Sequence, residues 1–307
     1  MRRTPGRALR ISAPELDEDQ PSRRVVVRSR SFEPAPPLRD FVRLYRFLNT
    51  SATPQVARRP IIARTGLVLV FNLHYRNPEV FEHRTSRRRI LPEVLLVGAQ
   101  NARRTDIVMT TGWTSFSVHF KPAGLYRLFH IPALQHTNRI VDAREVLGSD
   151  VDGLHAQLRA ANTTTAMHRL VENYLLNRLP HALPIHPVVR AAMKILKSHG
   201  AIPLNEITQN AGVGLRQFQR CFIEQMGMSP KVYARVARLN FVLEMKALKP
   251  SLSWTEIAAA AGYFDYKHLV RDFKAIVGTS PMDYLSSPRR LDDGFLLRQD
   301  GRPPAHV

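Results

Sequence analysis

The chain has 307 residues, of which 44% are hydrophobic, and this length allows two ordinary domains with separate cores. Lysine and arginine number 45 and aspartate and glutamate 25, which leaves a formal net charge of +20. Such a balance favours a polyanionic partner, with simple solubility as the alternative. The only cysteine, Cys221, excludes a disulfide framework and a cysteine-based zinc site, as expected for a cytoplasmic protein.

The two ends of the chain mix arginine, proline and acidic residues without a hydrophobic period, which predicts disordered tails at 1–20 and 287–307. The N-terminal stretch lacks the apolar core of a signal peptide. The longest apolar run, GLVLVF at 66–71, is too short for a membrane span. We therefore expect neither export nor membrane insertion.

Residues 21–180 are expected to form a β-rich domain with closing helices. Short runs rich in β-branched and aromatic residues predict strands of a sandwich or barrel; they are RVVVRS, GLVLVFNL, EVLLVG, TDIVMT and TSFSVHF. Apolar residues then recur at helical spacing between Met167 and Leu175, on a helix that packs on its own domain or makes a dimer contact. The proline-rich PHALPIHP predicts a linker at 181–187.

Residues 188–286 are expected to form an all-α domain containing an internal duplication. Helices are predicted at 188–199, 204–211, 215–226, 231–247, 254–261, 265–277 and 281–285. The pattern Phe218-x-Arg220-x-Phe222 recurs 51 positions later as Leu269-x-Arg271-x-Phe273, and Gly227-x-Ser229-Pro230 recurs as Gly278-x-Ser280-Pro281. In each copy a helix runs into a glycine-containing turn and a second helix follows, which is the arrangement that presents the second helix to the DNA major groove.

The second helix of the first copy has two chemically different faces. At 100° per residue Phe218 and Phe222 share the apolar face, while Arg216, Gln219 and Arg220 share the opposite one. Arginine can bond guanine O6 and N7, and glutamine can bond adenine N6 and N7. The polar face therefore has the chemistry that base reading requires, with a solvated surface as the alternative.

The corresponding face of the second copy carries Lys267, Val270, Arg271 and Lys274. Lysine offers a point charge to phosphate, and valine offers apolar contact to a thymine methyl group. Between the copies, a helix that starts at Pro230 after the cap Ser229 would form a rod of roughly 25 Å. This spacer could hold the two reading helices about one DNA turn apart, roughly 34 Å.

Residues 186–286 resemble the DNA-binding domain of the AraC family, which consists of two helix-turn-helix modules joined by a helix. The residues that carry the resemblance are Ile257-Ala258, Gly262-Tyr263, Leu269, Arg271, Phe273-Lys274, Gly278, Ser280-Pro281 and Tyr284. The resemblance implies base contacts at Arg216, Gln219, Arg220, Tyr266, Lys267, Val270 and Arg271. Lys267 replaces a usual small hydroxyl residue and Gly214 a frequent serine cap, and these departures leave the sequence preference of the second module open.

The first half resembles, more weakly, the N-terminal regions of one subgroup of that family. The stretches that carry this resemblance are LVLVFNL, LLVGAQNARRT and FSVHFKPAGLYRLFHIPALQHTNRIVDAREVLG. It implies a β-barrel, often cupin-like, that binds an effector or dimerises. The expected fold is therefore α+β with two domains, a cupin-like barrel followed by a double helix-turn-helix.

The leading hypothesis is a sequence-specific transcription regulator, activator or repressor, that binds double-stranded DNA and is not an enzyme. A small-molecule effector, a homodimer through the N-terminal domain and a contact with RNA polymerase are left open as partners. One alternative is a cupin-type metal enzyme fused to a DNA-binding domain, but His74, His83 and His119 lack metal-ligand spacing, so we expect neither a metal nor a cofactor. The other is a non-specific architectural DNA binder, for which the net charge would suffice.

Overall fold

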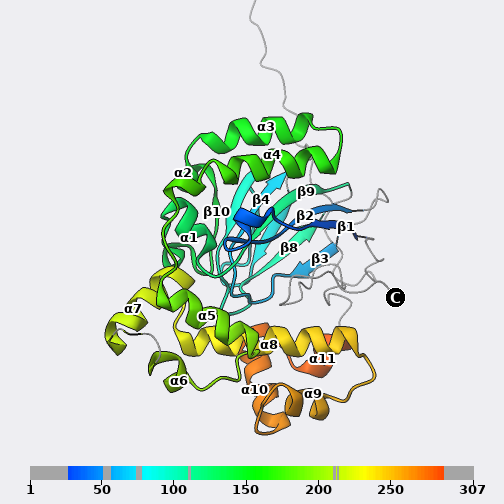
Figure 1. Cartoon of the computed structure of the whole chain (residues 1–307). Helices are drawn as coiled ribbons and strands as arrows, with labels where there is room; N and C mark the ends of the chain where they lie inside the picture. Colours follow the sequence, from blue (N-terminus) through cyan, green and yellow to red (C-terminus); the bar gives the residue numbers. More distant parts are fainter. Residues whose placement is uncertain are drawn as a thin grey trace, which may run out of the picture.

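The computed structural model describes residues 27–50, 57–73, 78–109, 112–209, 212 and 214–286. The two predicted tails, 1–20 and 287–307, lie outside the described residues. Figure 1 shows a β-rich part with its own helices above a layer of C-terminal helices, with the long helix α8 running along the boundary. The fold is therefore α+β with two parts, as the sequence predicts.

The strands form two antiparallel sheets, which we call the large and the small sheet. The large sheet contains, in spatial order, β1 (Val27–Phe32), β2 (Val42–Thr50), β9 (Thr114–Phe120), β4 (Val68–Asn72), β7 (Val94–Val97) and β10 (Ile140–Asp142). The small sheet contains β3 (Ala57–Pro60), β8 (Thr105–Met109), β5 (Glu79–Glu82) and β6 (Arg87–Ile90).

The expected closed, cupin-like barrel is not confirmed. Closure requires the first and last strands of a sheet to pair. Among the described strands, the large sheet ends at β1 and β10 and the small sheet at β3 and β6, and neither pair of edges is joined. The edge strand β10 has only three residues before α2 begins, and β3 and β6 have four each, so the edges offer few hydrogen bonds for closure.

Successive side chains of β9 point to opposite faces of the large sheet, and the sheet therefore separates two interiors. Phe116 and Val118 belong to the core between this sheet and the helices. Ser115, Ser117 and His119, which point to the opposite face, line a cavity on the side of the small sheet. The β-rich part is therefore layered as helices, large sheet and small sheet.

The helices of the β-rich part cover the outer face of the large sheet. They are η1 (Pro36–Leu38), α1 (Gly124–Phe129), η2 (Ala133–His136), α2 (Arg144–Leu147), α3 (Asp150–Ala160), α4 (Thr164–Leu176) and η3 (Leu179–His181). Val171 and Leu175 of α4 are fully buried in the same core as Phe116. The apolar stripe of α4 is therefore packed on its own chain.

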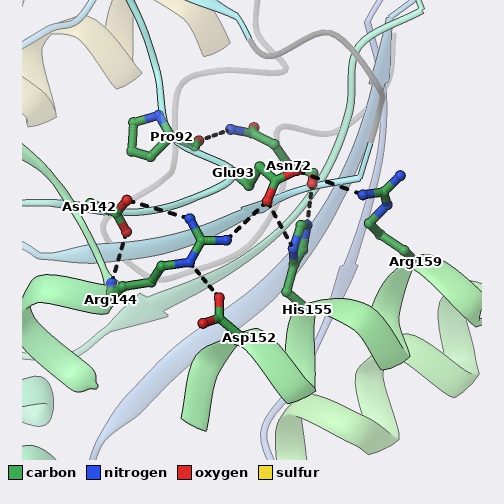
Figure 2. A network of polar contacts seen from close by, with 8 residues as sticks. All are labelled: Asn72, Pro92, Glu93, Asp142, Arg144, Asp152, His155 and Arg159. Carbon is green, nitrogen blue, oxygen red and sulfur yellow. Dashed lines mark hydrogen bonds and ion pairs between the residues drawn. The ribbon is translucent and has the colours of Figure 1, made fainter. Parts of the chain in front are cut away.

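A network of charged side chains fastens α2 and α3 to the edge of the large sheet (Figure 2). The guanidinium of Arg144 donates to Asp152 through Nε and to Glu93 through Nη2, the latter at 3.0 Å. Beside it, Nε2 of the His155 ring lies 2.7 Å from the carbonyl oxygen of Asn72. Charge-assisted bonds of this kind are stronger than neutral ones and hold both helices in register with the sheet.

The C-terminal part contains α5 (Pro187–Lys197), α6 (Leu204–Gln209), α7 (Leu215–Met226), α8 (Pro230–Leu248), α9 (Trp254–Ala260), α10 (Tyr266–Val277) and α11 (Pro281–Ser286). The predicted helices are present at these positions. The duplication is also visible in the backbone, because α7 and α10 have 12 residues each and end at glycines with positive φ, Gly227 at +81° and Gly278 at +84°. A left-handed residue at this point favours glycine.

The two parts of the chain share one continuous core and several backbone contacts. Ile62 and Ala63 of the β-rich part lie in the same apolar cluster as the buried residues of the C-terminal helices. Thr137 Oγ1 donates to the Gly227 carbonyl at 2.6 Å, which ties η2 to the end of α7. The Arg103 amide donates to the Ile276 carbonyl near the end of α10 at 2.7 Å. Both helix-turn-helix modules are therefore docked on the β-rich part.

The predicted linker is also held in place. The Leu183 amide donates to the Arg127 carbonyl at 2.8 Å, and Nε of the Arg127 side chain donates back to the Leu183 carbonyl at 2.9 Å. These reciprocal bonds fix the segment against α1.

The glycines that end α7 and α10 provide a matched test of the docking. Gly278→Ala places a methyl group in open space, so it should cost only the left-handed φ, about 1–2 kcal/mol. Gly227→Ala has the same φ cost, but its Cβ would also meet Thr137 Oγ1 and the loss should exceed that of Gly278→Ala by about 1 kcal/mol or more. Denaturant unfolding measures both variants, and equal losses would contradict the docked position of α7.

Candidate nucleic-acid interface

The predicted reading helix of the first module, α7, is anchored by its apolar face. Phe218 and Phe222 are completely buried, and the ring of Phe222 packs edge-on against Tyr233 of α8 with centroids 5.4 Å apart. Met226 is buried one turn further on. Because these residues recur at helical spacing, their burial decides which side of α7 faces solvent.

The opposite face of α7 presents the three predicted contact residues to solvent. Arg216, Gln219 and Arg220 are all exposed. Nη2 of Arg220 donates to Oε1 of Gln217 at 2.6 Å, an interaction within one turn that the sequence analysis missed. The i, i+3 spacing was the available signal. This bond restrains the guanidinium, which lowers the entropy lost when it contacts a base.

The predicted reading helix of the second module, α10, begins at a well-formed cap. The Asp265 carboxylate accepts the backbone N–H of His268 at 2.7 Å. Of the predicted contact residues, Lys267, Arg271 and Lys274 are exposed. Tyr266 and Val270 are half-buried, so each presents only part of its side chain.

Two interactions hold α10 against its neighbours. Leu269 and Phe273 are completely buried, and Phe273 packs edge-on against Trp254 of α9 with centroids 5.8 Å apart. On α8, the guanidinium of Arg235 donates to Asp272 Oδ1 through Nη2 at 2.7 Å and through Nε at 3.2 Å. The charged pair was not predicted, since its partners are 37 positions apart in the sequence. It orients α10 relative to the spacer helix.

A cavity of about 230 Å³ lies between the two sheets and the C-terminal helices. Its apolar walls come mainly from the strands, for example Val68, Leu95 and Ile107. Asn240 and Glu244 of α8 close it on the side of the C-terminal part. The cavity is therefore a candidate ligand site whose wall includes the spacer helix.

The polar part of the cavity wall is strongly basic. Burial lowers the pKa of Arg64 to about 10, and burial followed by the charge of Arg43 lowers the pKa of Arg46 to about 10. Both guanidiniums stay charged at neutral pH. Burial, then the charge of Arg46 and of the other arginines, holds the pKa of His119 well below its ordinary value, so this ring is neutral. Its Nε2 lies 3.1 Å from the Ser117 hydroxyl.

The histidines considered for a metal site do not converge. His83 Nε2 lies 3.0 Å from Asp106 Oδ1, His119 contacts Ser117, and His74 lies outside the described residues. In the part of the chain that the structure describes, no three His, Cys, Asp or Glu side chains lie close enough together to hold a metal ion. Within the same part, every helix is too short or too polar to cross a lipid bilayer.

Comparison with known protein families matches two segments. Residues 207–287 match the model of a helix-turn-helix domain, and residues 30–142 match a domain of unknown function (DUF6597). The C-terminal part carries an AraC-type helix-turn-helix domain. This AraC-type domain includes both reading helices, and the DUF6597 match spans both sheets. A search of curated proteins found no match.

Several solved structures are similar to the chain at low identity. One is ToxT from Vibrio cholerae O395, with a TM-score of 0.42, 9% identity and coverage of 85% of this chain and 97% of that chain. Another is the same protein bound to (E)-4-(8-methylnaphthalen-1-yl)but-3-enoic acid, with a TM-score of 0.43, 11% identity and coverage of 85% and 98%. The AraC-like activator CuxR has a TM-score of 0.21, 10% identity and coverage of 77% and 71%.

Proposed function

We propose that this protein is a transcription regulator that binds double-stranded DNA in a sequence-specific manner through both modules of its AraC-type domain. One observation carries the proposal: α7 and α10, 51 positions apart, each bury an apolar face and expose a face with arginine. A pair of equivalent cationic helices on one scaffold matches two successive major-groove segments.

The two modules differ in the chemistry that they offer. Arg216, Gln219 and Arg220 of α7 can form paired hydrogen bonds with purine edges. On α10, Tyr266, Lys267, Val270 and Arg271 offer a mixture of apolar and charged contacts, and Lys274 anchors a phosphate. The spacer α8 has 19 residues and is therefore roughly 28 Å long, comparable with one DNA turn of roughly 34 Å.

The cavity supports control by an effector. Its apolar walls suit a hydrocarbon body, and buried Arg46 and half-buried Arg64 add positive charge. Nε of Arg64 is buried and has no hydrogen-bond partner among the described residues. An anion would supply the missing acceptor and offset the cost of burying the charge. We therefore infer that the effector is an apolar molecule with a carboxylate head.

Two contacts connect this cavity to the reading helices. Glu244 of α8 forms part of the wall, so a ligand would touch the spacer directly. Ile140 also lines the wall, and it lies three residues after Thr137, whose hydroxyl bonds Gly227 at the end of α7. Occupancy of the cavity can thus change the relative positions of α7 and α10. Activation or repression, contact with RNA polymerase and a homodimer through the N-terminal part stay predictions.

Substitutions of exposed cations test base reading. Arg220→Ala should cost about 1–3 kcal/mol on the selected operator and relax specificity there, because a base contact is lost. Lys274→Ala should weaken binding to all duplexes alike and reduce the salt slope by about one, because a phosphate contact is lost. Titrations of operator and scrambled duplexes over a range of salt separate the two. Equal losses by both variants on both duplexes would instead support a non-specific architectural binder.

The effector chemistry can be tested with octanoate and 1-octanol, which share an apolar chain. Calorimetry should show that the protein binds octanoate at least about tenfold more tightly, since a charge-assisted bond contributes about 1.5–3 kcal/mol. Arg64→Met should abolish this preference and retain octanol binding, which also shows that the variant is folded. Arg39→Met, on the exposed surface, is the control and should keep the preference. Equal binding of the two compounds by the native protein would exclude a carboxylate site.

Thr137→Val tests the connection between cavity and α7. The substitution keeps the volume but removes the hydroxyl that donates to Gly227, so the ratio of DNA affinities with and without octanoate should move towards one. Thr164→Val is a matched control, because its hydroxyl contacts only Arg30 on the far side of the β-rich part among the bonds described. An unchanged ratio in Thr137→Val would show that the signal passes through α8 alone.

A further inference from the structure

Phe264 is the most exposed of the large apolar side chains in the described part of the molecule. It is 90% exposed, and it immediately precedes Asp265, the residue that caps α10. A single exposed apolar residue needs no function by itself. Phe264, however, lies directly before the N-terminus of α10, the predicted reading helix of the second module.

The turn that carries Phe264 is held on both sides. On one side Tyr263 is buried, and its amide donates to the Ala258 carbonyl at 3.0 Å. On the other side the Asp265 carboxylate accepts the His268 amide at 2.7 Å. With both neighbours fixed, the Phe264 side chain is directed away from the core. It is therefore presented by a rigid turn rather than by a loose loop.

The Phe264 ring lies at the end of the helix-turn-helix that is expected to contact bases. In these motifs the N-terminal residues of the second helix contact base edges in the major groove. Phe264 lies directly before this end of α10, and its ring centroid is 5.9 Å from that of His268 in the first turn. Lys267, next to His268, is exposed and can attract a phosphate. The ring thus lies beside the cationic face and not behind it.

We propose that Phe264 contacts the 5-methyl group of a thymine in the DNA segment read by the second module. The proposal rests on the proposed function and extends it. A phenyl ring cannot pair with phosphate or with the polar groups of a base edge, and the thymine methyl is the apolar group that the major groove presents. Half-buried Val270 adds a second apolar contact on the same helix. The second module would then require an A·T pair at one position, whereas α7 selects purines by hydrogen bonds.

Replacing thymine by deoxyuridine removes the methyl group and changes nothing else in the duplex. Each thymine of the second half-site is replaced in turn, and the affinity of the full-length protein is measured. The native protein should lose about three- to tenfold at one position, as expected for one buried apolar group. Phe264→Ala should lose a similar factor on the thymine duplex and show no further loss with deoxyuridine. Phe264→Leu, which stays apolar, should keep part of the response.

Met282→Ala is the matched control, because Met282 of α11 is 60% exposed and lies outside α10. It should bind both duplexes like the native protein. The proposal is overturned if Phe264→Ala responds to deoxyuridine as the native protein does, or if it binds every duplex with unchanged affinity. Unchanged DNA binding with lost transcriptional output would assign Phe264 to a protein partner instead. A native protein without any sequence preference would refute the proposed function as well, which separates the two failures.

Discussion

The burial of three phenylalanines, Phe218 and Phe222 of α7 and Phe273 of α10, is the interaction on which the C-terminal part depends. Phe218 and Phe222 of α7 and Phe273 of α10 are buried in one apolar cluster, which also contains residues of α8 and α9. Removing these faces from water leaves each helix with one possible orientation. The charged face must then point outward. The exposure of Arg216 and Arg271 to solvent is thus a consequence of hydrophobic packing, and the charges themselves contribute little to it.

The same core joins α7 and α10 to the β-rich part. Because Ile62 and Ala63 pack into the cluster that supports the reading helices, the two parts behave as neighbours with a shared interior. The cavity lies at this junction, with Glu244 of the spacer in its wall. A close-packed interior cannot absorb a small displacement locally, so the displacement is passed on to the neighbouring elements. In the proposed function, a ligand there would alter the geometry of DNA binding through contacts that already exist.

Nearly all of the C-terminal part could be predicted from the sequence, since helical faces, caps and turn glycines are local signals. The β-rich part was predicted less well. The long strand β2 was missed because Arg43 and Arg46 interrupt its apolar pattern, and Arg46 is explained only by the basic cavity that it lines. The expected barrel was not confirmed, because short runs indicate which segments are strands, whereas the pairing of edge strands depends on residues far apart in the chain.

By itself the sequence determined which residues of α7 and α10 are apolar and which are charged, and therefore which face each helix would bury. It also determined the repeat of 51 positions, because a repeat is recognised from residue identities alone. Tertiary structure alone decided the cavity, whose wall combines Arg46, Arg64, His119 and Glu244 from four separate segments. It alone also decided that Phe264 is exposed, because Tyr263 beside it is buried by a tertiary contact in which the Arg238 guanidinium of α8 lies 5.3 Å from its ring.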